Sequence, residues 1–99
     1  MIRVFEPSVT YKDIFKVALN MKKTFISGTS PVINQFEDEF ASLCSRKYAV
    51  AVSNGSVALD LALKSIKLEP DDEVILPSHT IISCLSAVIR SGAKPIFCD

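Results

Sequence analysis

The sequence has 99 residues, 48% of them hydrophobic, with 11 basic and 11 acidic side chains. This length suits one domain, and the composition is too apolar for a disordered chain. The net charge is zero and both signs are scattered, so nucleic acid and anionic membranes are disfavoured as partners. No apolar run approaches the roughly 18 residues of a membrane span. We therefore expect a soluble, cytoplasmic protein.

The three cysteines, Cys44, Cys84 and Cys98, are widely spaced and odd in number. This pattern suits reduced thiols in the cytosol better than a disulfide framework. Only one histidine is present, and no Cys-x-x-Cys or His-x-x-x-His spacing accompanies it. We therefore predict no metal site.

Two helices are predicted in the first half. Thr10 and Asp13 match a capping box, and an apolar stripe follows them. Residues 24–30 are rich in glycine and small hydroxylated residues, which indicates a loop. Ser30 and Pro31 are a start signal for the second helix. Its predicted buried face is Val32, Ile33, Phe36, Phe40 and Leu43. Glu37, Asp38 and Glu39 are interpreted as solvated residues of its early turns.

The second half alternates between short apolar runs and helical patterns. Residues 48–52 lack polar alternation, which is typical of a parallel strand covered on both faces. A helix is predicted from about Ser56 to Lys67, a turn at residues 69–72, and a second strand at residues 73–77.

An amphipathic helix over residues 80–90, which Gly92 would terminate, leads to a third strand at residues 95–98. The spacing predicts an α/β fold with three βαβ-linked, mainly parallel strands and flanking helices. Three such strands leave a sheet edge unpaired. We therefore favour the N-terminal part of a larger α/β fold over a small complete domain.

The junction at Ser53-Asn54-Gly55-Ser56 connects the first predicted strand to its helix. The first amides of a helix have no intrahelical acceptor, and the helix dipole is positive there, so this junction is a candidate anion site. It lacks the lysine of a phosphate-binding loop and the repeated glycine of a dinucleotide fingerprint. A glycine that only makes the turn explains the same residues on spacing alone.

A second polar segment, residues 77–80, lies at the end of the next predicted strand, where ligands bind in open α/β sheets. The two segments together favour a phosphate site over a simple turn. His79 has no assignable partner and is interpreted as a loop or capping residue, Cys84 as a small packed side chain, and Asp99 as a solvated carboxylate.

Three motifs in this order and spacing resemble the DegT/DnrJ/StrS aminotransferase family. They span residues 50–59, 72–80 and 92–99, and residues 26–28 and 32–40 look like the family's N-terminal loop and following helix. The family consists of pyridoxal 5'-phosphate (PLP) enzymes acting on nucleotide-linked keto-sugars. The resemblance covers nearly the whole chain and implies part of the large domain of a type I PLP transferase.

By this resemblance, Gly55, Ser56 and Val57 would hold the PLP phosphate through backbone amides and the Ser56 hydroxyl. Ile81 stands where many members place an aromatic ring against the pyridine face, so it would cover that face without aromatic stacking. Ser56 replaces the commoner threonine and keeps the hydroxyl.

The resemblance places the Schiff-base lysine and the acidic partner of the pyridinium downstream of residue 99. We therefore assign no catalytic residue. In the full-length enzyme the resemblance implies PLP, a nucleotide-sugar substrate, glutamate as amino donor and a homodimer. The dimer would use the loop at residues 26–28.

We expect the N-terminal part of a single aminotransferase large domain. Residues 1–46 would form its helices and loop, and residues 47–99 the start of its sheet. Such a chain would be inactive alone and would belong to polysaccharide, lipopolysaccharide or antibiotic-sugar synthesis. The alternatives are a non-catalytic remnant and a binding module for a phosphorylated metabolite.

Overall fold

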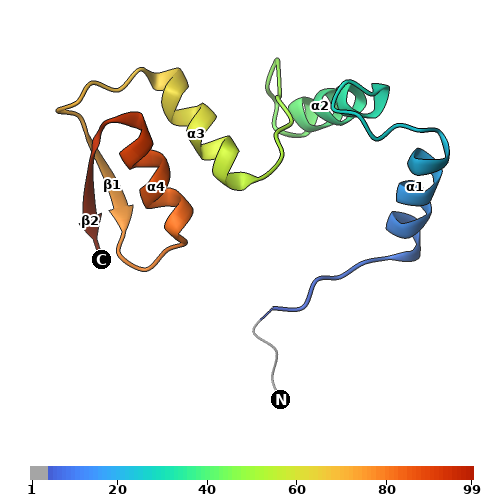
Figure 1. Ribbon diagram of the computed structural model, residues 1–99, viewed down its shortest axis with the longest axis horizontal. Coiled ribbons are helices and arrows are strands. Elements are labelled where there is room, and N and C mark those ends of the chain that lie inside the picture. The colour runs from blue at the N-terminus through green and yellow to red at the C-terminus, as the bar shows by residue number, and fades with distance from the viewer. Residues whose placement is uncertain (1–4) are drawn as a thin grey trace. The chain divides into compact units, whose positions relative to one another are not determined.

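The computed structural model describes residues 5–99, which divide into two compact units with the boundary between Ala51 and Val52. The first unit holds helices α1 (Tyr11–Lys22) and α2 (Pro31–Leu43). The second holds α3 (Gly55–Ile66), β1 (Glu73–Pro77), α4 (Ile82–Ser91) and β2 (Lys94–Cys98) (Figure 1).

Helix α1 begins with the predicted capping box. The Asp13 N–H donates to Thr10 Oγ1 at 3.3 Å, and the Thr10 N–H donates to Asp13 Oδ2 at 2.8 Å. The Thr10 hydroxyl also donates to Asp13 Oδ2, at 2.7 Å. Donation by the Thr10 backbone N–H, and then by the Thr10 hydroxyl, lowers the pKa of the Asp13 carboxyl. Both ends of the box thus satisfy groups that a helix start leaves without partners.

Helix α2 begins after Ser30 with Pro31 in its first turn, as predicted. The predicted buried face is wrong for three of its five residues, because Phe36, Phe40 and Leu43 are exposed. Val32 and Ile33 are half-buried, and Ala41 alone is fully buried in this helix. Amphipathic spacing supplies an apolar face, but burial needs a second surface to cover it. No such surface covers these side chains among residues 5–99.

Glu37 is not a simple solvated residue. It is half-buried, and its Oε1 accepts a hydrogen bond from the Ala51 N–H at 2.7 Å. The carboxylate therefore links α2 to the extended residues that end the first unit, an interaction across 14 positions.

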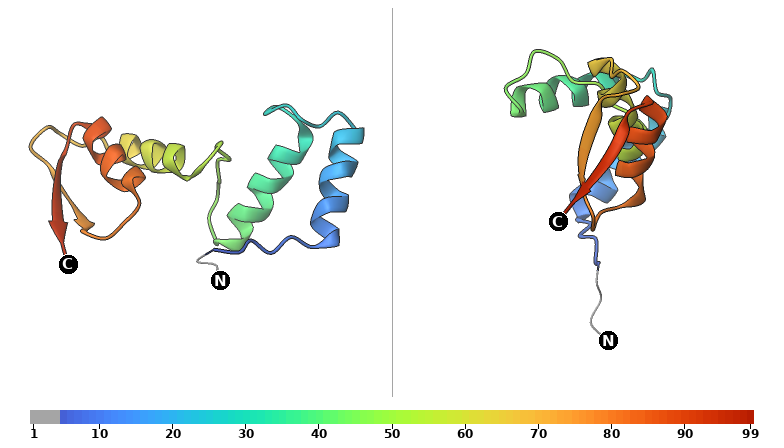
Figure 2. Two further views of the ribbon diagram at one scale, coloured as in Figure 1. Left: turned by 60° about the horizontal axis from the view of Figure 1, so that its bottom comes forward. Right: turned by 90° about the vertical axis from the view of Figure 1, so that its left-hand side faces the viewer.

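The second unit is built on one βαβ element (Figure 2). Strands β1 and β2 are parallel, with Glu73 opposite Lys94 and Pro77 opposite Cys98. The connection between them is α4, which contacts both strands and also packs against α3. Gly92 ends α4 as predicted, with a left-handed φ of 89° that favours glycine.

The hydrophobic core lies within this second unit. Leu76, Val88 and Ala93 are buried at its centre. Partly buried side chains pack around them, namely Leu63, Leu68, Val74, Cys84 and Leu85. The interpretation of Cys84 as a small packed residue is therefore confirmed.

The predicted strand over residues 48–52 is not formed. These residues carry no regular structure, and Tyr48 and Val50 are 75% and 67% exposed. A strand is made by hydrogen bonds to a neighbouring segment, so an apolar run does not form one alone. Among the described residues the sheet contains only β1 and β2, which leaves two parallel strands where three were predicted.

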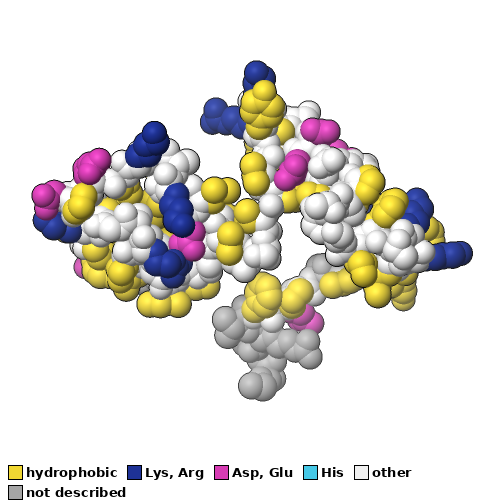
Figure 3. Space-filling model, turned by 45° about the horizontal axis from the view of Figure 1, so that its top comes forward, with side chains coloured by type: hydrophobic (Ala, Val, Ile, Leu, Met, Phe, Trp, Pro, Cys, Tyr) yellow, Lys and Arg dark blue, Asp and Glu magenta, His cyan; other side chains and the backbone are white. Residues whose placement is uncertain are grey.

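Hydrophobic side chains remain on the surface of both units (Figure 3). No helix in the described part of the chain is long and apolar enough to cross a membrane. All three cysteines are free thiols. Within residues 5–99, no group of three or more metal-ligating side chains is gathered in a binding arrangement.

Candidate functional site

The N-terminus of α3 lies where the sequence places the anion site. Asn54 adopts an extended backbone and caps the helix, its Oδ1 accepting from the Val57 N–H at 3.1 Å. Helix α3 starts at Gly55, so Gly55 and Ser56 occupy its first two positions, where the amides have no intrahelical acceptor. Neither amide has a hydrogen-bond acceptor in the part of the chain that the structure describes.

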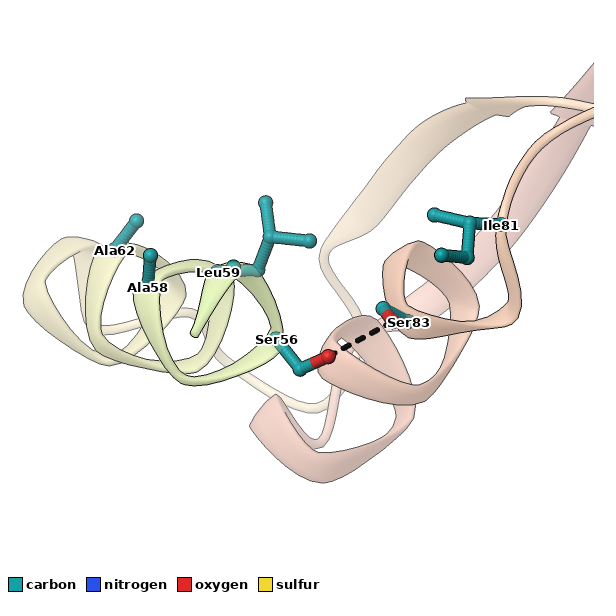
Figure 4. A pocket seen from close by; sticks show the side chains of 7 residues that line it. Ser56, Ala58, Leu59, Ala62, Ile81 and Ser83 are labelled. Carbon is teal, nitrogen blue, oxygen red and sulfur yellow. Dashed lines mark hydrogen bonds between the residues drawn. The ribbon is translucent and has the colours of Figure 1, made fainter. Parts of the chain in front are cut away.

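A pocket of about 610 Å³ opens beside this helix start. Gly55 and Ser56 line it together with Ile81 and Ser83, which stand at the start of α4 (Figure 4). Ala58, Leu59 and Ala62 of α3 complete the wall. The structure thus brings together three of the four predicted site residues from segments about 25 positions apart in the sequence.

The pocket joins the N-termini of two helices. Ile81 is the N-cap of α4 and Ser83 its second residue, so the first turn of α4 lies at the same pocket as the first turn of α3. Each helix start carries partial positive charge from its aligned peptide dipoles. No ionised side chain lines the pocket, so backbone and hydroxyl donors provide its electrostatic character.

Two hydroxyl groups meet at the pocket wall. Ser56 Oγ donates to Ser83 Oγ at 2.8 Å, and both residues are half-buried (Figure 4). Sequence reasoning assigned Ser56 and missed Ser83, because Ser83 falls in a helical pattern where serine has no distinctive meaning. The available signal was its position, six residues after the end of β1.

Ile81 and Val57 differ in their relation to the pocket. Ile81 lines it and is 67% exposed, so its side chain is accessible to a ligand. Val57 does not line it, and its amide is already bonded to Asn54. The Val57 amide would reach an anion only after leaving that cap.

The segment at residues 77–80 lies outside the pocket lining. Ser78 instead donates from its hydroxyl to Asp99 Oδ1 at 2.6 Å and from its N–H to the Cys98 carbonyl at 2.9 Å. His79 lies in the bend after β1 and is exposed, which agrees with its interpretation as a loop residue. The polar wall of the pocket is therefore made by Ser83 and not by this segment.

The pocket combines backbone amides that have no acceptor with apolar side chains. Gly55 needs no special backbone conformation, and a Cβ added there would meet no heavy atom within 4 Å. The fold therefore does not require a glycine at this position, whereas close approach of an anion to the backbone does favour one. Ile81 and Leu59 supply apolar surface beside these donors.

Comparisons with known proteins identify the family of the chain. The model of the DegT/DnrJ/EryC1/StrS aminotransferase family matches residues 10–99. The chain is 42% identical over 98 residues to a protein named GDP-perosamine synthase from Escherichia coli O157:H7, a match that covers 99% of this chain and 27% of that protein.

Two solved structures share the fold. An aminotransferase from Psychrobacter cryohalolentis is 36% identical with a TM-score of 0.83, over 94% of this chain and 24% of that one. The E. coli GDP-4-keto-6-deoxy-D-mannose-3-dehydratase with bound hydrated PLP is 26% identical with a TM-score of 0.79, over 93% and 25%. The chain thus spans about a quarter of the length of the proteins it matches, and it belongs to the DegT/DnrJ/EryC1/StrS aminotransferase family.

Proposed function

We propose that this chain forms the N-terminal, phosphate-binding part of a PLP-dependent aminotransferase that acts on nucleotide-linked keto-sugars. PLP, when bound in such an enzyme, acts as an electron sink for amino-group transfer. The chain's own contribution is to bind and orient the phosphate through the Gly55 and Ser56 amides, while Ile81 covers one side of the ring. The amino donor in this proposal is glutamate, and the whole enzyme is a homodimer in the cytoplasm.

One observation carries the proposal. The unpaired amides of Gly55 and Ser56 share a pocket with the apolar side chain of Ile81, although Ser56 and Ile81 are 25 positions apart. A phosphorylated aromatic ring requires this combination of donors and apolar surface, whereas a glycine that only makes a turn requires neither. The family membership supports the same cofactor.

The lysine that would bind PLP covalently is not supplied by the pocket. Lys47, Lys64, Lys67 and Lys94 all lie outside its lining. In this proposal the reacting centre belongs to the remaining three quarters of the enzyme. The purified chain should therefore bind the phosphate moiety and show no transaminase turnover.

The test is a titration of the ¹⁵N-labelled chain with pyridoxamine 5'-phosphate, which has no aldehyde and so does not label surface lysines. We expect saturable shifts of the Gly55 and Ser56 amides, and no such shifts with unphosphorylated pyridoxamine. Gly55→Ala should keep the dispersed spectrum and lose most of the phosphate response, because the new methyl group lies where the phosphate approaches.

Two results of this titration would contradict the proposed phosphate site. Shifts that appear equally with pyridoxamine, or an unchanged affinity in Gly55→Ala, would mean that this helix start does not bind the phosphate. Turnover by the purified chain would contradict the placement of the lysine outside it.

A phosphorylated-metabolite binding module is a second candidate. Every residue that lines the pocket belongs to the second unit, which also contains the hydrophobic core. This observation favours a module that binds its ligand within one unit. Ribose 5-phosphate separates the two functions, because it offers a phosphate without an aromatic ring. Equal affinity for ribose 5-phosphate and pyridoxamine 5'-phosphate favours the module, and weaker binding of the sugar phosphate favours the cofactor site.

A further inference from the structure

Helix α3 has a single neighbouring element. Its backbone lies close to that of α4 and to no other helix or strand of the second unit. Apolar contact with the core comes from Leu63, which packs against the cluster around Val88. The hydrophobic effect is not directional, so this packing attaches α3 without closely fixing its displacement along α4. Directional contacts between the two helices fix that placement more closely.

Two side-chain contacts show that α3 and α4 run in the same direction. Ser56 and Ser83, each the second residue of its helix, have hydroxyl oxygens 2.8 Å apart. Further along both helices, Asp60 of α3 contacts Arg90 in the last turn of α4. Both helix starts therefore lie at the same end of the pair, and each carries partial positive charge. Because like charges side by side oppose this alignment, it needs a contact that stabilises it.

The Asp60–Arg90 ion pair is such a contact. Arg90 donates from Nε at 3.0 Å and from a terminal guanidinium nitrogen at 2.8 Å, both to Asp60 Oδ1. A planar guanidinium that donates twice restricts the orientation of its partner as well as the distance. The Asp60 side chain is 27% exposed and that of Arg90 51%, so the pair is partly shielded from solvent.

The ion pair lies outside the pocket. Neither Asp60 nor Arg90 lines it, and Arg90 stands in the last turn of α4, whereas Ile81 and Ser83 stand at its start. The pair therefore influences the shape of the pocket only through the placement of the two helix starts.

We propose that Asp60 and Arg90 are positioning residues. Their ion pair holds the start of α3 beside the start of α4, so that the Gly55 and Ser56 amides and the Ile81 side chain face one ligand. This inference rests on the proposed function, since it concerns the ligand of the same pocket. It predicts that the pair matters for a ligand that uses both helices, and not for a ligand that uses α3 alone.

The experiment compares two dissociation constants, both measured from the Gly55 and Ser56 amide shifts of the full chain. Pyridoxamine 5'-phosphate offers a phosphate to α3 and a ring to Ile81, whereas ribose 5-phosphate offers the phosphate without the ring. An ion pair shifts the balance between two helix placements by no more than its own free energy, a factor of about five at most for a partly exposed pair. Arg90→Ala should therefore weaken binding of pyridoxamine 5'-phosphate relative to ribose 5-phosphate by about threefold.

The ratio of the two constants separates positioning from two other effects of the substitution. A smaller fraction of folded chain, or the loss of the Arg90 charge, weakens both phosphates by the same factor and leaves the ratio unchanged. A role in stability alone would therefore not move this readout.

Further variants test the pair as a unit. Asp60→Ala should change the ratio as Arg90→Ala does, and the double variant should show no further change. Arg90→Lys keeps the charge without the planar fork and should give an intermediate ratio. Lys94→Ala is the matched control, because it removes the ion pair with Asp71, whose side chain is 93% exposed, and should leave the ratio unchanged.

The outcomes distinguish this inference from the proposed function. A wild-type ratio in Arg90→Ala, or an equal change in Lys94→Ala, overturns the inference and leaves the proposed function in place. Absence of any phosphate-dependent shift in the wild type, or equal affinity of the wild type for the two ligands, overturns the cofactor site together with this inference.

Discussion

The two units of the chain carry similar sequence patterns and reach different degrees of burial. In the first, two amphipathic helices expose their large apolar side chains, and the buried residues of the described part are Ser30 and Ala41. In the second, Leu76, Ala87, Val88 and Ala93 are buried. Both units have apolar stripes at helical spacing, so patterning alone does not account for the difference.

The difference lies in what covers the apolar face. Parallel strands need a crossover, and in the second unit the crossover helix α4 packs on the strands that it connects. The βαβ element therefore supplies the buried centre of its core within residues 73–98, and Leu63 and Leu68 of the preceding segment pack against it. An amphipathic helix such as α2 supplies one surface and depends on a partner for the other.

The strongest test of this comparison is a cavity at the centre of the second unit. Val88 is 1% exposed and is the largest fully buried side chain, so Val88→Ala should lower the free energy of unfolding by about 2–3 kcal/mol. The measurement is urea denaturation followed by the amide signals of β1 and β2.

Two control substitutions test whether the loss of stability is specific to the buried position of Val88. Ile89→Ala changes the next residue of α4, which is 59% exposed, and Phe36→Ala changes an exposed aromatic in the first unit. Both should cost less than about 1 kcal/mol. A loss for Phe36→Ala as large as that for Val88→Ala would mean that the first unit has a core of its own.

A second comparison uses two glycines of the second unit. Gly92 has a φ of 89° at the end of α4, so Gly92→Ala forces an L-residue into the left-handed region and should cost about 1–2 kcal/mol. Gly55 has no such φ, so Gly55→Ala should leave stability unchanged or slightly raised. Thermal unfolding of both variants checks this. Equal destabilisation would show that Gly55 serves the turn and not a ligand.

Structural features that depend on neighbouring residues were predicted correctly from the sequence, and features that depend on distant segments were not. The capping box at Thr10, the helix start at Pro31 and the helix end at Gly92 depend on neighbours within a few residues, and all three are confirmed. The strand at residues 48–52 required a partner segment, and sequence pattern does not state whether a partner is present. Glu37 was misinterpreted for the same reason, since its acceptor role involves Ala51.

The site shows the same division. The start of α3 at Gly55 is a local feature and was predicted within one residue. Gly55, Ser56 and Ile81 line one pocket, and their role in binding a cofactor stays a prediction. The Ser56–Ser83 hydrogen bond joins two helices and has no sequence signature. The role of Val57 stays a prediction, and its bond to Asn54 explains why an amide near a helix start is not always available.

The helix caps provide a smaller test of the two units. Asn54 accepts from Val57, so Asn54→Ala should cost about 1 kcal/mol. Ser30 makes no such bond, and its buried hydroxyl has no partner among the described residues, so Ser30→Ala should cost nothing or stabilise. Chemical denaturation of each variant gives the comparison. A destabilisation by Ser30→Ala similar to that by Asn54→Ala would show that the Ser30 hydroxyl has a partner in solution.

The smallest expected effect concerns the pH dependence of α1. The Thr10 backbone N–H, and then the Thr10 hydroxyl, hold the pKa of the Asp13 carboxyl below its ordinary value near 4. The native state therefore favours the charged carboxylate. Its stabilising contribution is present above the ordinary pKa and is lost as the pH falls through the lower, folded pKa. Because the pair is exposed, only the first turn of α1 should fray.

Amide and Cα shifts of α1 measured between pH 6 and pH 2 give that profile. Asp13→Asn removes the titrating group while keeping a side-chain acceptor, so the first turn of this variant should lose the acid-dependent step. The second unit offers the internal reference, because the capping acceptor of α3 is the amide oxygen of Asn54, which does not titrate. If the start of α3 frays with the start of α1 on acidification, the response belongs to the whole chain, and the two units are not as independent in stability as their separate contacts indicate.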